Sequence, residues 1–343
     1  MKNILITGGA GFISHHLIYY LIKKTKWNIV SLDRLDYSGN LNRLDSILSE
    51  FSYKEKSRVK VAFHDLKSEI NPWVKKEIGE IDIILHLAAG SHVDRSIDYP
   101  MEFVLDNVVG TANILNYARE INESKKLERF IYFSTDEVFG PAPKGIDYEE
   151  NARYNSTNPY SATKAGGEEL AVAYENTYGL PVYITHTMNV FGERQHPEKF
   201  IPMCIKKIRD GEPITIHSDK TKTIPGSRHY IHAEDVAEAI YFLLTNRIKS
   251  QIDFGGAKCP KFNIVGSEEI DNLQLAKTIA SAQGKELKYE MVDFHSSRPG
   301  HDLRYSLSGE KMKKLGWQPS IKLTERIKQV VEWSLKNQNW IEL

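Results

Sequence analysis

The hydrophobic positions of the chain fall into short, nearly continuous apolar runs that are rich in β-branched residues. Six of these runs are expected to be strands: Asn3–Thr7, Asn28–Asp33, Val59–His64, Ile81–Leu87, Arg129–Ser134 and Pro181–His186. Continuous rather than alternating runs are typical of parallel strands that helices cover on both faces. Longer helix-compatible segments separate several of the runs, as βαβ crossovers require. The pattern therefore predicts an α/β fold with a doubly wound parallel sheet.

Amphipathic helices are expected between the strands. After the first strand, apolar residues recur at helical spacing: Phe12, Ile13, Leu17, Ile18, Leu21 and Ile22. Lys23 and Lys24 follow near the C-terminal end, where the helix dipole favours cations. The segments Phe103–Ile121 and Tyr160–Tyr178 are also compatible with helices.

Two stretches lack regular patterning. Gly140–Pro159 is rich in proline, glycine and polar residues, and His217–Arg228 has the same character, so both are expected to be surface loops. Beyond Gly192 the alternation of strands and helices weakens. This change predicts a smaller C-terminal lobe that closes over the C-terminal ends of the strands, and binding clefts form at such junctions.

The composition is that of a globular protein. The chain has 343 residues, of which 41% are hydrophobic and 26% charged, so one large domain with an appendage or two domains are expected. Lysine plus arginine and aspartate plus glutamate each number 45, which gives a formal charge of zero. Such a chain has no overall basic field to attract nucleic acid or anionic lipid, so neither is expected as a partner.

The two cysteines, Cys204 and Cys259, are too few for a disulfide framework or a metal cluster and suit a reducing compartment. The longest apolar run, Ile81–Ala89, falls short of the roughly 20 residues of a membrane helix. A strand-like segment begins almost at the initiator Met, which argues against a leader peptide. We therefore expect a cytoplasmic protein without a bound metal.

A glycine-rich segment, Thr7–Ser14, lies between the first expected strand and helix. Its glycines permit a tight turn and let backbone N–H groups approach a pyrophosphate at the helix N-terminus. Asp33 ends the second strand, 22 residues after Gly11, where a carboxylate accepts hydrogen bonds from an adenosine ribose. A glycine turn with a nearby Asp is often only a turn, but together these features predict a dinucleotide site. Asp33 favours NAD over NADP, and Arg34 would partly offset that preference.

Tyr160 and Lys164 are four residues apart in a predicted helix and therefore share a face. A tyrosine with a pKa of about 10 is a poor base, and a neighbouring ammonium favours its phenolate form. The alternative is an ordinary amphipathic helix with a buried Tyr and a surface Lys. The glycine loop favours the first interpretation, with Tyr160 as base and Lys164 as its activator and ribose ligand.

The segment Ser134–Gly140 follows the fifth expected strand, at the edge where open α/β sheets bind ligands. Two adjacent carboxylates in a turn are usually solvated. However, a hydroxyl followed by two carboxylates would also meet the needs of one specific reaction, the dehydration of a sugar. Oxidation of the sugar at C4 gives a ketone that acidifies the C5–H bond, and loss of water across C5–C6 then needs a base and an acid. Glu137 and Asp136 would supply them.

The motifs Thr-Gly-x-x-Gly-Phe-Ile at Thr7–Ile13 and Tyr-Ser-Ala-Thr-Lys at Tyr160–Lys164 resemble the extended short-chain dehydrogenase/reductase superfamily over nearly the whole chain. One departure is Ser14, where that superfamily has a third glycine. The resemblance implies a Rossmann-type domain, expected at residues 1–191 plus about 229–254. Residues 192–228 plus about 255–343 are then expected to form a nucleotide-sugar-binding lobe.

Four longer motifs resemble the dTDP-glucose 4,6-dehydratases. They are His86–Ser96, Ser134–Gly140, Pro197–Pro202 and Arg298–Tyr305. The resemblance implies that Thr135 hydrogen-bonds the C4 oxygen, Tyr160 takes its proton and NAD receives the C4 hydride. Asp136 then protonates the leaving hydroxyl, Glu137 removes the C5 proton, and the hydride returns to C6.

Binding residues follow from the same resemblance. The implied cofactor contacts are Gly8, Gly11, Phe12, Ile13, Asp33, Arg34, Asp36, Ser38, Gly39, Asp65, Leu66, Leu87, Ala88, Ala89, Ser91, Asn107, Ser134, Tyr160 and Lys164. The implied substrate contacts are Ser91, His92, Thr135, Asn189, Lys199, Phe200, His217, Arg228, Asn263, Arg298, His301 and Tyr305. Three departures bear on the substrate: Gly90 replaces a common Glu, His217 replaces a Tyr near the base, and the loop from His217 to Arg228 is longer.

Other functions compete with the dehydratase. A 4-epimerase or a UDP-glucuronate decarboxylase would need Tyr160 and Lys164 but not the pair Asp136 and Glu137. A non-catalytic NAD-binding regulator would have no need for Thr135, Tyr160 and Lys164 together. A dehydratase for a UDP, GDP or CDP hexose is a further alternative to one for dTDP-glucose.

The resemblance also implies a homodimer, in which the helices within Phe103–Ile121 and Tyr160–Tyr178 pair as a four-helix bundle. The apolar positions concerned would equally suit packing on the sheet: Val104, Val108, Leu115, Leu170, Ala171 and Tyr174.

Overall fold

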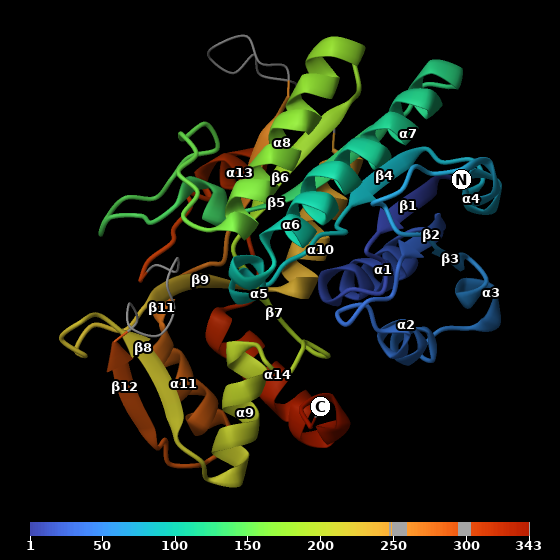
Figure 1. Cartoon of the computed structure of the whole chain (residues 1–343). Coiled ribbons are helices and arrows are strands. Elements are labelled where there is room, and N and C mark those ends of the chain that lie inside the picture. Colours follow the sequence, from blue (N-terminus) through green and yellow to red (C-terminus); the bar gives the residue numbers. More distant parts are fainter. Residues whose placement is uncertain (247, 249–258, 294–302, 343) are drawn as a thin grey trace.

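A seven-stranded parallel sheet forms the centre of the computed structural model, which describes residues 1–246, 248, 259–293 and 303–342 (Figure 1). The strand order is β10-β6-β5-β4-β1-β2-β3. The strands are β1 (Asn3–Thr7), β2 (Asn28–Asp33), β3 (Val59–Phe63), β4 (Ile83–His86), β5 (Arg129–Thr135), β6 (Val182–Thr187) and β10 (Lys261–Ile264). All neighbouring pairs are parallel. The predicted doubly wound sheet and its six expected strands are confirmed.

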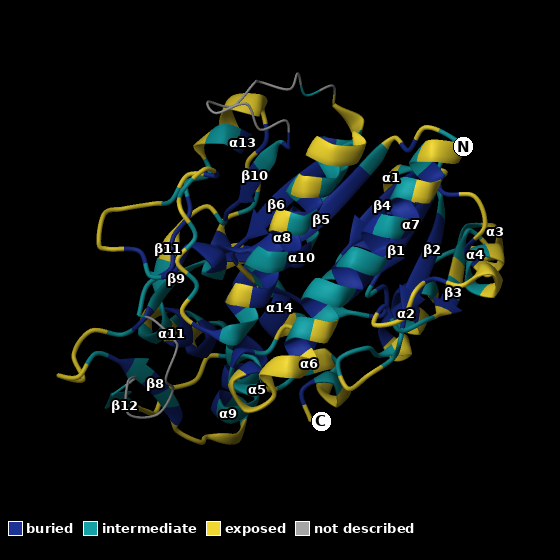
Figure 2. Cartoon of the chain, turned by 45° about the horizontal axis from the view of Figure 1, so that its top comes forward, coloured by how far each residue is buried: buried dark blue, intermediate teal, exposed yellow. Residues whose placement is uncertain are grey.

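Helices cover both faces of this sheet, and the central strands β1, β4, β5 and β6 are deeply buried (Figure 2). Ile4 and Ile6 of β1 pack with one helical layer, whereas Leu5 points to the other. The first layer contains α1 (Phe12–Lys24), α2 (Leu41–Leu48), α10 (Ala233–Thr245) and α13 (Glu310–Leu315). The second contains α4 (Pro72–Ile78), α7 (Gly110–Ser124) and α8 (Pro159–Tyr178). This two-sided burial explains the continuous apolar runs.

Short helices complete this part of the chain. They are α3 (Tyr53–Lys56), α5 (Val93–Asp98) and α6 (Pro100–Val104). A π-helical turn, Leu105–Val109, joins α6 to α7. The predicted helix Phe103–Ile121 is therefore interrupted near its start, and α8 begins at Pro159, one residue before the predicted Tyr160.

A smaller lobe lies below the sheet in Figure 1. Its strands are β7 (Asn189–Phe191), β8 (Ile214–Ser218), β9 (Ser227–His232), β11 (Glu269–Asp271) and β12 (Tyr289–Asp293). Its helices are α9 (Phe200–Asp210), α11 (Asn272–Ala282) and α14 (Leu323–Lys336). Ile205, Ile214, Ile279 and Val331 share its separate apolar core.

Two sequence predictions need correction here. The stretch His217–Arg228 is not irregular throughout, because β8 extends through Ser218 and β9 begins at Ser227. The predicted lobe boundary places β10 outside the sheet, yet β10 pairs with β6, and its Phe262 packs in the same core as Met312 of α13. A four-residue strand with only two apolar residues carries too weak a pattern to identify.

The predicted loop Gly140–Pro159 is irregular as far as Asn158 except for an isolated bridge at Tyr148, and Pro159 begins α8. The smaller lobe holds the loop in place. Arg304 donates to the carbonyl oxygens of Pro143 and Ile146 and forms ion pairs with Asp147 and Glu269. Because this loop connects β5 to α8, its anchoring fixes the approach to both elements. Among the described residues, no helix has the length and apolar character needed to cross a membrane.

Candidate active site

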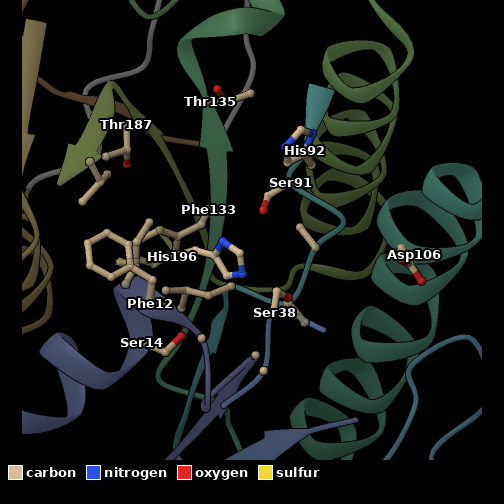
Figure 3. A pocket seen from close by; sticks show the side chains of 18 of the residues that line it. Phe12, Ser14, Ser38, Ser91, His92, Asp106, Phe133, Thr135, Thr187 and His196 are labelled. Atoms are coloured by element: carbon tan, nitrogen blue, oxygen red, sulfur yellow. The ribbon is translucent and has the colours of Figure 1, made fainter. Parts of the chain in front are cut away.

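The main pocket lies at the carboxyl edge of the sheet, where the strand order reverses between β1 and β4. Figure 3 shows Phe12 and Ser14 from α1, Ser91 and His92 from the segment after β4, and Thr135 at the end of β5 around one cavity. Further lining residues come from the loop after β2, the end of β6 and the start of α9. One cavity therefore joins the glycine loop to the smaller lobe.

The glycine loop makes a close approach that only glycine allows. Gly8 has a φ of +68°, and a Cβ there would lie 2.9 Å from the Ala88 backbone. A Cβ on Gly9 would lie 2.1 Å from the Ser31 Oγ. Ser14, at the position of the missing third glycine, is buried and lines the pocket. The loop therefore packs against β2 and β4 and leaves the start of α1 facing the cavity.

The Asp33 carboxylate is held firmly at the end of β2. One oxygen accepts a hydrogen bond from the Ala10 N–H at 3.0 Å, and the other accepts one from the Leu35 N–H at 2.8 Å. Leu35 adopts a φ of 57°, so the chain turns sharply at this point. The remaining acceptor capacity of Asp33 faces the cavity that it lines and suits a ribose diol.

The carboxylates Asp136 and Glu137 lie in a 3-10 turn, Asp136–Phe139, directly after β5. The Thr135 hydroxyl donates to Asp136 Oδ1 at 3.0 Å, and the Asn158 side chain donates to Glu137 Oε2 at 3.0 Å. Asp136 is 5% exposed, and its buried Oδ2 has no hydrogen-bond partner among the described residues. Both carboxylates line the pocket. They are therefore not the solvated pair that a turn would ordinarily contain.

Burial raises the pKa of both carboxyl groups. Burial, and after it the charge of the neighbouring Asp136, raise the pKa of Glu137 to about 7. Burial also raises the pKa of Asp136, while Arg228 acts in the opposite direction. One member of such a pair can hold a proton while the other releases one.

Helix α8 carries Tyr160 and Lys164 into the same pocket. Asn158 caps the helix through the Ser161 N–H and also contacts Glu137, so the cap ties the helix to the carboxylates. Burial raises the pKa of Tyr160 above its ordinary value, and Glu137 adds to this effect. The two residues share the predicted helix face.

Lys164 is 4% exposed, and burial lowers its pKa to about 7. Its ammonium donates to the Phe133 carbonyl at 2.5 Å and lies 4.4 Å from the centre of the Tyr132 ring. A surface Lys is thereby excluded as the alternative. The activation of Tyr160 by Lys164 stays a prediction, because in this structure the ammonium is directed to the carbonyl.

Most of the predicted binding residues line this pocket. Those for the cofactor are Gly8, Gly11, Phe12, Ile13, Asp33, Arg34, Asp36, Ser38, Gly39, Asp65, Leu66, Leu87, Ala88, Ala89, Ser91, Ser134, Tyr160 and Lys164. Those for the substrate are Ser91, His92, Thr135, Asn189, Lys199 and Phe200. Arg298 and His301 lie outside the described residues.

Two predicted contacts do not line the pocket because their side chains hold the surrounding structure together. Asn263 is fully buried in β10, where it donates to the Tyr148 and Ser308 carbonyls and contacts His186 at 3.0 Å. Asn107 exchanges hydrogen bonds with both backbone groups of Gly90. A direct ligand role for either residue stays a prediction, and the structure gives both a role in holding the surrounding segments together.

Three further predicted substrate residues are also absent from the pocket lining: His217, Arg228 and Tyr305. His217 is paired with Val292 within β8 and β12. The Arg228 guanidinium lies 4.5 Å from the centre of the Tyr305 ring and donates to the Leu303 carbonyl. Arg228 acts on the carboxylates through its charge. Direct contacts from these three residues stay predictions.

Several lining residues were not predicted from the sequence. They are Tyr37, Arg43, Asp106, Thr187, Met188, His196, Glu198 and Tyr230. Thr187 and Met188 stand at the carboxyl end of β6, so the rule that ligands bind at strand ends identifies them. Glu198 lies within Pro197–Pro202, one of the four segments that resemble the dTDP-glucose 4,6-dehydratases. Asp106 carries no local sequence signal.

A family model described as GDP-mannose 4,6 dehydratase matches residues 5–330. The chain belongs to this family. A dTDP-glucose 4,6-dehydratase of Haemophilus influenzae is 38% identical over 347 residues, covering 98% of this chain and 99% of that protein. An Arabidopsis thaliana protein named trifunctional UDP-glucose 4,6-dehydratase/UDP-4-keto-6-deoxy-D-glucose 3,5-epimerase/UDP-4-keto-L-rhamnose-reductase is 37% identical over 342 residues, covering 99% of this chain and 48% of that protein.

Solved structures agree with this family assignment. DesIV of Streptomyces venezuelae, a dTDP-glucose 4,6-dehydratase with NAD and TYD bound, has a TM-score of 0.85 at 31% identity, covering 99% of each chain. A UDP-glucuronic acid 4-epimerase of Bacillus cereus, at 23% identity and a TM-score of 0.84, shares the fold. The predicted membership of the extended short-chain dehydrogenase/reductase superfamily is confirmed.

The raised pKa of Glu137 predicts a pH-dependent effect of Glu137→Gln on stability. Between the ordinary carboxyl pKa of 4.5 and about 7, the folded protein binds more protons at this site than the unfolded chain. Folding stability therefore falls as pH rises through this window. The neutral Gln lacks this penalty. We expect the variant to melt roughly 2–4 °C above the wild type at pH 8 and close to it at pH 4.5.

Scanning calorimetry at both pH values measures the difference. Glu332→Gln, which removes an exposed carboxylate from α14, is the matched control and should behave alike at the two pH values. An equal shift at both pH values in Glu137→Gln would contradict burial of the charge.

Proposed function

We propose that this protein is an NAD-dependent nucleotide-sugar 4,6-dehydratase that converts dTDP-glucose to dTDP-4-keto-6-deoxyglucose. The observation that carries the proposal is that buried Asp136 and half-buried Glu137 line one pocket with Tyr160, since elimination of water needs an acid and a base at a site that also oxidises C4. The names of the relatives support the same reaction. The reaction is a hydro-lyase reaction with no net oxidation.

The residues present fit NAD. The cradle formed by Gly8 and Gly9 has no room for a side chain, and the held Asp33 carboxylate suits an unmodified adenosine ribose. Structures of related dehydratases contain NAD. A bound NAD would supply the acceptor for the C4 hydride and the donor that returns this hydride to C6. The segment after β4 and Lys164 would hold its ribose end.

The side chains at the end of β5 and on α8 divide the proton transfers between them. Thr135 hydrogen-bonds the C4 oxygen, and Tyr160 takes the proton from that hydroxyl during oxidation. The C5 proton, acidified by the C4 ketone, is removed by Glu137, whose pKa of about 7 suits a base at neutral pH. Asp136, whose pKa is raised by burial, gives its proton to the departing C6 hydroxyl.

The choice of base rests on the relatives rather than on the pocket. Relatives named for dTDP-glucose and for UDP-glucose are of similar identity to this chain. The thymine methyl group is worth only about 1–3 kcal/mol in a hydrophobic contact, so discrimination between the two should be modest. An epimerase or decarboxylase would not require both carboxylates in the pocket that contains Tyr160.

Turnover of labelled substrates tests the reaction and the base together. dTDP-glucose with deuterium at C4 should give a 4-keto-6-deoxy product with the deuterium at C6, because the hydride returns within one active site. UDP-glucose should react more slowly, and GDP- and CDP-glucose should be poor substrates. Mass spectrometry and NMR of the products locate the label. Recovery of a C4 epimer, or activity confined to a purine sugar nucleotide, would refute the proposal.

We also infer a cytoplasmic location, which the two buried free thiols, Cys204 and Cys259, support. For the homodimer, part of the predicted helix face is unsuitable, because Leu115 and Ala171 are fully buried against the sheet. The other predicted positions are partly exposed and would form the contact instead: Val104 at the end of α6, Val108 in the π-helical turn, and Leu170 and Tyr174 on α8.

Light scattering at micromolar concentration should give twice the 39.2 kDa mass of one chain. Leu170→Glu should lower the mass to that of one chain, because it places a charge within the helix contact. Tyr53→Glu, at a residue 88% exposed on α3, is the matched control and should leave the dimer intact. A single-chain mass for the wild type would rule the dimer out.

A further inference from the structure

Arg34 follows Asp33 directly at the end of β2, where a cation can accommodate a 2′-phosphate on the adenosine ribose. From the sequence, Arg34 was expected to offset part of the preference of Asp33 for NAD. In the structure, however, the Arg34 guanidinium is already engaged by other side chains. Which groups engage it therefore decides whether it is available to a phosphate.

Asp106 makes the main contact with Arg34. Its two carboxylate oxygens accept from the two terminal nitrogens of the guanidinium at 2.5 and 2.8 Å, which is a bidentate ion pair. Asp36 accepts from the Nε and one Nη at 3.1 and 2.6 Å, and Asp65 lies 3.5 Å away. All the nitrogens of Arg34 thus face carboxylates.

The position of Asp106 is fixed by the fold. Asp106 belongs to the π-helical turn Leu105–Val109, and its side chain is 10% exposed and lines the pocket (Figure 3). The next residue, Asn107, fastens this turn to Gly90 and to the Thr163 hydroxyl. The carboxylate is therefore presented to Arg34 by a rigid segment, and a shift of Arg34 toward a ligand would break a preformed pair.

The charges around this end of the pocket also oppose a phosphate. Among the described lining residues that come from β2, the loops after β2 and β3, α2 and the π-helical turn, the carboxylates are Asp33, Asp36, Asp65 and Asp106, and the cations are Arg34, Arg43 and Lys67. Arg43 donates its Nε and Nη1 to carbonyl oxygens, and Lys67 lies 3.7 Å from Asp65 and 3.9 Å from Asp106. A 2′-phosphate would add further negative charge where carboxylates already exceed cations, whereas a ribose hydroxyl adds none.

We propose that Asp106 is a specificity-determining residue that excludes 2′-phosphorylated dinucleotides by holding Arg34 in a bidentate ion pair. The proposal rests on the use of a nicotinamide dinucleotide proposed above. Asp33 supplies the favourable contact with the ribose diol. Asp106 occupies the Arg34 guanidinium, which would otherwise be available to bind a phosphate in the same place.

Competition between NAD and NADP tests this role. The full-length protein is equilibrated with an equimolar excess of both dinucleotides and freed of unbound nucleotide. It is then denatured, and the released NAD and NADP are quantified by mass spectrometry. Asp106→Asn keeps the shape of the side chain but removes its charge. We expect the ratio of bound NADP to bound NAD to rise at least tenfold over the wild type.

A double variant shows whether Arg34 is responsible. Arg34→Leu combined with Asp106→Asn should return the ratio to within about threefold of the wild-type value. Asp36→Asn, which removes the second partner of Arg34, should give a smaller rise than Asp106→Asn and remains informative if the latter does not fold. Glu120→Gln controls for net charge and should leave the ratio unchanged.

Two results with the variants would overturn the proposal. An unchanged ratio in folded Asp106→Asn protein, or a rise that persists without Arg34, would assign the discrimination to other residues. Failure of the wild type to retain either dinucleotide would instead refute the proposed function, and the two failures are therefore distinguishable.

Discussion

The close packing of α8 against β5 is the contact on which the rest of the site depends. A Cβ on Gly167 would lie 2.5 Å from the Tyr132 hydroxyl and 2.6 Å from the Asn107 carbonyl, so only glycine permits this approach. The same hydroxyl donates to the Lys164 carbonyl at 2.9 Å. These contacts bring Tyr160 and Lys164 next to the end of β5, where Lys164 is buried and Tyr160 is half-buried. Desolvation then shifts the pKa of Glu137 upward and that of Lys164 downward, both to about 7.

A second buried polar cluster supports this arrangement from behind. Glu168, one turn beyond Lys164 on α8, is fully buried and accepts from Lys261 at 2.9 Å, while His186 lies 3.1 Å from both of its oxygens. Its charge partly counters the effect of burial on Lys164. Asn263 belongs to this cluster through His186. A buried charge without such partners would cost several kcal/mol. The buried Glu168 cluster therefore helps to stabilise the Lys164 ammonium in the pocket wall.

The sequence is most informative where one residue type answers a local demand. Continuous apolar runs identify β1 to β6, the glycine segment identifies the turn before α1, and Asp33 and Asp136 are found at strand ends. Contacts between distant segments give no such signal. Arg34 and Asp106 are 72 positions apart, and Asn263 is 77 positions from His186, so no periodicity relates them. The short β10 and the π-helical turn are likewise set by tertiary packing rather than by local pattern.

The central claim is that one desolvated pocket performs oxidation and elimination with separate residues. A single-turnover experiment with dTDP-glucose and the Asp136→Asn, Glu137→Gln double variant tests this claim most directly. Because these carboxylates act only after the C4 ketone has formed, the absorbance of the reduced nicotinamide should rise and persist, with no 4-keto-6-deoxy product. Undiminished product from the double variant would contradict the account.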